Sequence, residues 1–376
     1  MLTSTVMRSR PRAGSRVRSL WRAELARGRD LDLAGDHDAA RAAFARAQAM
    51  APDQAEPAWA LGRAEQRRGR VIEAERLYRL ALAARPAWPL AAIALARLLV
   101  ARGSTSAAID EARRILAPAR AAHPDHGLMT VVEAELLLEE GRTDEAKRLL
   151  RQAEAAGVRE PVLALAMARA ENLAGIALAA DGRADEAAFA FKRACDLDPH
   201  WAPPRANLGA LWQRLGKRQH ALAQYERALA IDPQHALSHF NLGILLRERA
   251  DLDGAARAFA AAHRAEPPHA DARMELAMTL SARGEHARAI VLFEEELRRA
   301  ARAPQTLLTN LGVAHLRAGD RTRAEAAFRA ALASQPDHLP ALRNLAHLYA
   351  CEGRLVEAAA LLRRAEGNSE PSPASN

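Results

Sequence analysis

Residues 201–235, WAPPRANLGALWQRLGKRQHALAQYERALAIDPQH, carry the pattern that decides the fold. Apolar, small and helix-ending residues occur here at fixed intervals: Leu208, Gly209, Gly216, Ala221, Tyr225, Ala228 and Pro233. The same intervals return 34 residues later, with Leu242, Gly243, Ala255, Phe259, Ala262 and Pro267. The pattern can be followed in ten copies along the chain, and a period of this length is typical of a solenoid of stacked units. Such a chain presents a long surface, so a binding groove is expected rather than a catalytic pocket.

Each copy predicts two helices. The 34 positions within each copy are numbered from 1 to 34, so that Pro233 and its equivalents occupy position 32. Apolar residues then recur at positions 4, 7, 8 and 11, and again at 20, 24 and 27, which places them on one face of each helix. Glycine at position 15 can end the first helix in the left-handed conformation, and proline at position 32 closes the second. Because one helix pair cannot bury its apolar face alone, neighbouring copies must stack.

The repeated pattern resembles the tetratricopeptide repeat family over nearly the whole chain. A large apolar residue at position 7, a small one at 8, alanine at 20 and 27 and an aromatic residue or leucine at 24 carry the resemblance. It implies an all-α, right-handed superhelical solenoid of about ten helix-turn-helix repeats. It also implies that the first helices line a concave surface that binds protein segments, with positions 2, 5, 6, 9, 12 and 13 facing inward.

Composition narrows the class of protein further. The chain is 49% apolar but only 4% aromatic, which suits a helical array rich in alanine and leucine. No uncharged apolar run reaches about 18 residues, so no membrane span is expected, and the first residues lack the apolar core of a secretory signal. Cys195 and Cys351 form neither a disulfide framework nor a zinc spacing, which favours a cytoplasmic protein. The near-absence of lysine beside abundant arginine is typical of a GC-rich bacterial genome.

The net charge of +8 is concentrated at the start of the chain. Six arginines precede the first acidic residue, Glu24, so the remainder of the chain is nearly neutral. We expect residues 1–15 to be a basic disordered arm that is simply solvated. The alternative is that this arm binds a nucleic acid or an anionic surface.

The phase of the repeats slips at two main places, after the third copy around Leu116 and after the fourth around Pro161. We therefore divide the array into four N-terminal repeats, residues 16–160, and six C-terminal repeats, residues 161–366. The insertion at Pro161 is expected to lengthen the helix that starts there. Residues 367–376, rich in serine and proline, are expected to form a disordered tail. Val356, Leu361 and Leu362 of the last repeat are expected to be partly uncovered, which suggests self-association or contact with a partner.

Position 6 differs between the two parts of the array. It holds Ala26, Ala60, Ala94, Val132 and Leu173 in repeats 1 to 5, and Asn207, Asn241, Glu275, Asn310 and Asn344 in repeats 6 to 10. The recurring asparagine resembles the ladder in the repeats of O-linked N-acetylglucosamine transferase, which implies contact with the backbone of an extended peptide. An amide can match a peptide N–H and C=O whatever the side chains are. The alternative is that these amides bond across neighbouring helices and only support the array.

Neighbouring inward positions would supply specificity for the bound peptide. They hold Phe240, Arg247, Met274, Arg317, Arg343 and His347. Arginine suits carboxylates and methionine adapts to varied apolar partners, so the peptide is expected to be acidic and apolar. The lysine-dependent carboxylate clamp of some related grooves is not expected here.

The sequence contains no phosphate-binding loop, nucleophile elbow or zinc-protease motif. Four of the thirteen histidines, His126, His235, His269 and His338, share position 34, as turn residues would, so no metal is expected, and no cofactor is expected either. We expect a non-enzymatic scaffold that binds an extended peptide or protein segment. Two alternatives remain, namely a substrate-recruiting accessory subunit of a separate modifying enzyme, and an adaptor that acts through the arginine arm.

Overall fold

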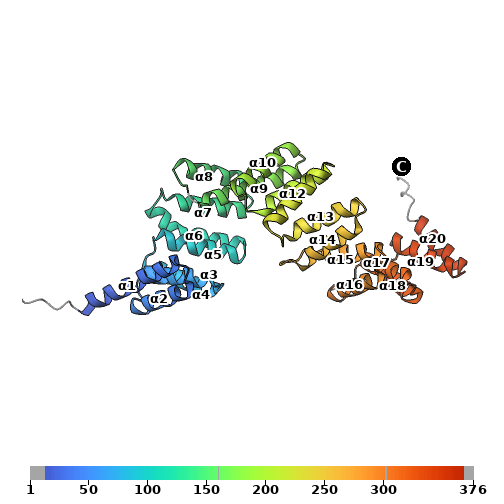
Figure 1. Ribbon diagram of the computed structural model, residues 1–376, viewed down its shortest axis with the longest axis horizontal. Coiled ribbons are helices and arrows are strands. Elements are labelled where there is room, and N and C mark those ends of the chain that lie inside the picture. The colour runs from blue at the N-terminus through green and yellow to red at the C-terminus, as the bar shows by residue number, and fades with distance from the viewer. Residues whose placement is uncertain (1–12, 160, 301–302, 368–376) are drawn as a thin grey trace, which may run out of the picture. The chain divides into compact units, whose positions relative to one another are not determined.

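The computed structural model describes residues 13–159, 161–300 and 303–367. Residues 1–12 of the predicted arm and 368–376 of the predicted tail lie outside these ranges. The described residues form twenty helices and no strand, which confirms the all-α repeat architecture (Figure 1). The chain divides into two compact units, residues 1–182 with 196–198, and residues 183–195 with 199–376. The division at residue 160 stays a prediction.

Unit 1 contains the first nine helices. They are α1 (Ala13–Leu33), α2 (His37–Met50), α3 (Ala55–Arg67), α4 (Val71–Ala84), α5 (Pro89–Arg102), α6 (Ser106–Ala122), α7 (Gly127–Glu139), α8 (Thr143–Ala155) and α9 (Pro161–Ala180). Each odd-numbered helix up to α7 packs on the even-numbered helix that follows it, and each even-numbered helix packs on the next odd-numbered one. The core is therefore a line of alanine and leucine clusters between successive pairs.

Unit 2 contains most of α10 and the remaining ten helices. They are α10 (Ala184–Leu197), α11 (Ala202–Arg214), α12 (Arg218–Ile231), α13 (Ala236–Glu248), α14 (Leu252–Arg264), α15 (Ala272–Ala282), α16 (His286–Arg299), α17 (Gln305–Arg317), α18 (Arg321–Ser334), α19 (Leu339–Cys351) and α20 (Leu355–Gly367). From α11 to α20, pairs form and stack as they do in unit 1.

Glycine at position 8 lets an aromatic ring at position 24 lie against the first helix of the same repeat. A Cβ atom added at these glycines would lie 2.6–2.7 Å from a ring carbon, closer than real Cβ contacts. The pairs are Gly62–Tyr78, Gly209–Tyr225, Gly243–Phe259 and Gly312–Phe328. Each of these rings is fully buried. The aromatic ring thus sets the distance between the two helices of a repeat. It thereby also positions the face of the first helix that points away from the second helix.

The turn between the two helices of a repeat uses the left-handed conformation expected at position 15. In most repeats a glycine occupies this position, with φ between 71° and 88°. Repeat 7 places Ala250 there with a φ of 61°, and it is the one non-glycine residue with positive φ among the described residues. An L-residue pays a steric cost in that conformation, so repeat 7 has a strained turn.

The phase slips of the sequence have structural causes in unit 1. The slip after repeat 3 corresponds to α6, which has 17 residues where α2 and α4 have 14, and which contains Pro118. The slip after repeat 4 corresponds to α9, which begins at Pro161 and has 20 residues. The predicted lengthening of the helix at Pro161 is confirmed.

Helix α9 is, by length and composition alone, apolar enough to cross a membrane, and 44% of its most apolar window is buried. Leu163, Ala166 and Ala170 pack with residues of α7 and α8 in one cluster. Its polar groups are paired too, because Lys147 Nζ lies 2.9 Å from Glu171 Oε2. These contacts are those of a core helix of the repeat array.

The last repeat exposes part of its apolar surface. Val356 and Leu362 are exposed, as expected, and so is Leu355. Leu361 is buried in the cluster of α19 and α20, so its predicted exposure is wrong, because its side chain turns toward the helix pair and not away from it. Self-association through this surface stays a prediction.

Candidate functional site

The first-helix face is defined here by positions 2, 5, 6, 9, 12 and 13 of each first helix. In unit 2 it carries Asn241 on α13, Asn310 on α17 and Asn344 on α19, and all three side chains are half-buried. Within the described part of the chain, none of these three amides forms a hydrogen bond to another residue, unlike the interhelical bonding of the scaffolding alternative. Asn207 on α11 is half-buried at the same position and takes part in an interaction of its own. The face therefore presents a recurring set of open amides.

Glu275, which interrupts the asparagine series, has a structural partner. Arg247 of α13 donates a hydrogen bond to Glu275 Oε2 on α15, the first helix of the next repeat. The guanidinium of Arg247 also lies 5.6 Å from the ring centroid of Phe259. In this structure Arg247 links two repeats, so it can contact a ligand carboxylate only by sharing or leaving Glu275.

Phe240 and Met274, which were predicted to contact a peptide, also belong to the packing of repeats 7 and 8. The ring of Phe240 lies edge-on to Phe259 at 5.7 Å and is stacked on His269 at 3.7 Å. Met274 is half-buried against the same apolar cluster. Both residues form a firm apolar patch beside the amides.

The other predicted contacts on this face are accessible. Arg317 at the end of α17 and Arg343 on α19 are exposed, and neither forms an ion pair with a described residue. His347 is exposed, with its Nε2 atom 3.8 Å from Cys351 Sγ. Among the residues that the structure describes, no group of three or more His, Cys, Asp or Glu side chains is placed to hold a metal ion.

Two cavities lie on the first-helix face of unit 1, where no site residue was predicted. The first, of about 450 Å³, is called the tryptophan cavity and lies between repeats 1, 2 and 3. Its lining residues are Arg29, Asp32, Leu33, Phe44, Trp59, Ala60, Arg63, Arg67 and Leu90. Ala60 occupies position 6, so a small residue there opens the space that asparagine occupies in unit 2.

Charge in the tryptophan cavity is uneven. Arg67 of α3 donates two hydrogen bonds to Asp32 of α1, and this contact, together with His37 and against the opposing effect of burial, holds the pKa of Asp32 below its usual range. Arg29 and Arg63 form no ion pair with any described carboxylate, and Arg63 lies 5.0 Å from the Trp59 ring centroid. Three arginines face one aspartate, which leaves two positive charges uncompensated.

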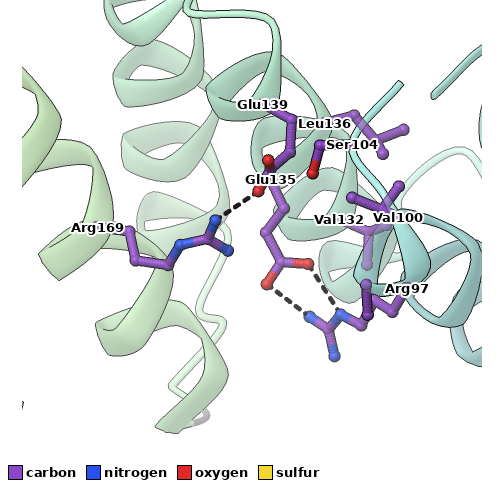
Figure 2. Close-up of a pocket in the computed structure, with 9 residues that line it drawn as sticks. Arg97, Val100, Ser104, Val132, Glu135, Leu136, Glu139 and Arg169 are labelled. Carbon is purple, nitrogen blue, oxygen red and sulfur yellow. Dashed lines mark hydrogen bonds and ion pairs between the residues drawn. The ribbon is translucent and has the colours of Figure 1, made fainter. Parts of the chain in front are cut away.

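The second cavity, of about 360 Å³, is called the paired-charge cavity and lies between repeats 3, 4 and 5. Figure 2 shows its two ion pairs, in which Arg97 faces Glu135 and Arg169 reaches Glu139. The Arg97 pair is bidentate, at 2.8 and 3.1 Å, and the Arg169 contact is 2.5 Å. Apolar side chains, Val132 at position 6 among them, form the rest of the wall. This cavity is internally neutralised.

Glu139 shows how firmly the charges of the paired-charge cavity are held. Burial by itself would raise its pKa, but hydrogen bonds from Ser104 and Arg169 outweigh burial and hold the pKa below the usual range. Glu139 is therefore ionised at neutral pH, and Arg169 compensates its charge. The unpaired arginines of the tryptophan cavity have no such partner among the described residues.

The residues of the two cavities could have been found from the repeat numbering. Trp59 is at position 5, while Arg29, Arg63, Arg97 and Glu135 are at position 9, so all belong to the inward positions. Arginine recurs at position 9 in repeats 1 to 3, which is the signal in the sequence for these cavities. The cavities themselves depend on which different side chains meet across neighbouring repeats.

Helix pairs stack within each unit, with an open face of amides in unit 2 and two cavities on the first helices of unit 1, as in a repeat protein that interacts with other proteins. Tetratricopeptide repeat matches cover residues 25–89, 131–200 and 309–373, and further matches of the same description cover 205–231 and 224–257. The chain belongs to the tetratricopeptide repeat family. No curated protein matches it.

Several solved structures are similar in fold. YrrB, described as a TPR protein with an unusual peptide-binding site, is 19% identical, with a TM-score of 0.43 over 51% of this chain and 95% of that chain. PilF of Pseudomonas aeruginosa is 19% identical, with a TM-score of 0.46 over 55% and 93%. The human IFIT1 dimer with PPP-AAAA is 17% identical, with a TM-score of 0.47 over 96% and 85%.

Proposed function

We propose that this chain is a non-enzymatic scaffold that holds an extended protein segment along the first-helix face of unit 2. Tetratricopeptide repeats make the chain a protein-interaction scaffold in general terms. The observation that carries the finer proposal is the recurrence of half-buried, unbonded amides at Asn241, Asn310 and Asn344. A half-buried polar group without a hydrogen-bond partner is stabilised when a bound ligand provides that partner.

The chemistry of an amide fits a peptide backbone. One side chain can donate to a carbonyl and accept from an N–H, so its contacts do not depend on the peptide's sequence. Packed helices lie about 8–10 Å apart and an extended chain advances about 3.3 Å per residue, so one repeat would contact roughly every third peptide residue. Phe240 and Met274 supply the apolar neighbour, and Arg343 supplies an open cation.

The test is the Asn241→Ala, Asn310→Ala double variant. Labelled peptides that share length but differ in side chains are titrated with the full chain, and fluorescence anisotropy gives each affinity. Each hydrogen bond contributes about 1 kcal/mol, so two lost amides weaken every peptide by at least about tenfold. The melting temperature should change little, because these amides form no bond within the described chain.

The matched control is Gln219→Ala, which removes an exposed amide from the second helix α12. It should leave all affinities unchanged. A double variant that loses stability but binds every peptide as the native chain does would refute the proposal and favour a supporting role for the amides. A loss confined to one peptide would show that side chains, and not the backbone, are read.

A further inference from the structure

The tryptophan cavity combines three features in a small volume of unit 1: an aromatic wall, aliphatic side chains at its rim, and uncompensated positive charge. We infer that it is a separate recognition site for a short acidic peptide segment that carries an aliphatic side chain between its carboxylates. The inference shares the scaffold role of the proposed function, but it does not rest on the amides of unit 2. Its volume of about 450 Å³ lies in the range of known ligand pockets.

The positive charge is available to a ligand. Arg29 of α1 and Arg63 of α3 are exposed, and neither forms an ion pair with a described residue. Arg41 and Arg67 nearby are both paired with carboxylates. Arg67 donates two hydrogen bonds to Asp32, which compensates its charge. Two open guanidinium groups match two carboxylates in a charge-assisted arrangement.

The apolar part of the cavity is built for an aliphatic side chain. Leu33 is 89% exposed and Leu90 is 39% exposed, both at the wall of the cavity, while Phe44 and Ala60 are buried behind them. Exposed leucines that line a cavity lose contact with water when an aliphatic group enters. The cavity therefore favours a segment in which an apolar residue stands next to acidic ones.

The same features argue for a peptide over a single-stranded nucleic acid. Stacking of a base requires an open aromatic face, but Trp59 is half-buried, lies 5.4 Å from Trp88 and has Arg63 over its ring. Two uncompensated charges confined to one cavity also fall short of the extended basic track that follows a phosphate backbone. A peptide carboxylate needs only the local pair.

The experiment uses the full chain and a fluorescein-labelled peptide with the core Glu-Leu-Glu between glycine-serine flanks. Comparison peptides replace the core with Gln-Leu-Gln, which removes the charge, or Glu-Ser-Glu, which removes the aliphatic group. A labelled single-stranded oligouridylate is the nucleic-acid probe. Binding is measured by anisotropy for the native chain and for Arg29→Gln, Arg63→Gln and the combined variant, and it is repeated over a range of salt concentrations.

The expected result is that Glu-Leu-Glu binds at least about tenfold tighter than either comparison peptide, and that added salt weakens it. Each arginine variant should weaken Glu-Leu-Glu by about threefold or more, and the combined variant by about tenfold. The matched control is Arg27→Gln, an exposed arginine of the same helix α1 that does not line the cavity, and it should bind as the native chain does. Neither Arg29 nor Arg63 forms an ion pair with a described residue, but Arg63 lies over the Trp59 ring, so the melting temperature of each variant is compared with that of the native chain.

The two proposals fail separately. Loss of Glu-Leu-Glu binding in the Asn241→Ala, Asn310→Ala variant with none in the Arg29 and Arg63 variants would overturn this inference and support the site in unit 2. Equal binding of Gln-Leu-Gln, equal loss in Arg27→Gln, or no binding of Glu-Leu-Glu at millimolar peptide would also overturn it. Tighter binding of the oligouridylate, lost with the same two arginines, would assign the cavity to a nucleic acid instead.

Discussion

Replacing Gly243 with alanine tests the contact that sets the geometry of repeat 7. The new Cβ atom would lie 2.6, 2.7 and 2.9 Å from three ring carbons of Phe259, a side chain with 0% exposure. Carbon atoms at rest lie about 3.5–4.0 Å apart, so the ring or the helix must move by roughly 0.9 Å. Overpacking of this kind costs about 1–3 kcal/mol, and the better helix propensity of alanine returns about 1 kcal/mol. With three contacts below 3.0 Å, the expected net loss is about 1–2 kcal/mol.

The assay must be local, because repeat arrays open in parts. Hydrogen exchange followed by mass spectrometry should show amides of α13 and α14 exchanging about 5 to 30 times faster, while urea unfolding gives the accompanying change in overall stability. The effect should reach the first-helix face, because Phe240 and Arg247 both contact the Phe259 ring. Peptide affinity should therefore fall together with protection.

Two comparisons make the result decisive. Gly103→Ala is the matched control, since a Cβ there meets nothing within 4 Å and its φ of 165° is extended backbone, so stability should stay unchanged. In a Phe259→Leu background, which removes the ring, Gly243→Ala should cost nothing. Equal or greater stability for Gly243→Ala alone, or the same loss in both backgrounds, would refute the view that the Phe259 ring is the reason why only glycine fits at position 243.

Ala250→Gly should raise the stability of repeat 7 by about 0.5–1 kcal/mol, since glycine adopts a φ of 61° without steric cost; slower exchange in α14 would show it, and no change would argue against strain. Burial lowers the pKa of His235 and His315 below 6.5, so the unfolded chain binds protons first as pH falls. Stability should be full above pH 6.5 and decline below it, and melting curves for His315→Gln should show a smaller decline than those of the native chain. Burial also raises the pKa of Tyr78 to about 12 and that of Tyr225 in the same direction. Ultraviolet titration should therefore show little phenolate until pH passes about 11, and a normal tyrosine titration at pH 10 would contradict the burial of both hydroxyls.

The fold could be predicted from the sequence because the contacts that form each helix pair lie within one repeat. Leucine at position 7, alanine at 20 and the glycine of position 15 depend on neighbours within the same 34 residues, so spacing alone predicts the helix pair. The longer helix at Pro161 was predicted for the same reason. Leu361 was predicted less well, because its burial depends on the turn of α20 against α19, and not on its place in the repeat.

The candidate sites divide along the same line. Asn241 and its equivalents could be found because one residue type recurs at one position, and periodicity exposes it. The residues of the tryptophan cavity occupy inward positions of the repeat, but the cavity itself could not be predicted, since Arg29, Trp59 and Leu90 come from three different repeats and only the structure shows that they meet. The partner of Arg247 was hidden too, because the pairing with Glu275 spans two first helices.

Sequence by itself determined the repeat, the family and the set of side chains that first helices present. Tertiary structure alone decided which of those side chains meet, which arginines are paired and where space remains between them. The physical reason is range. Helix formation and helix pairing depend on contacts within one repeat, whereas an ion pair such as Arg67–Asp32 or a cavity depends on how far neighbouring first helices stand apart. That distance depends on the side chains packed between successive repeats, such as Phe44 of α2 in one cluster with Leu61 and Ala64 of α3, and the sequence alone does not give it.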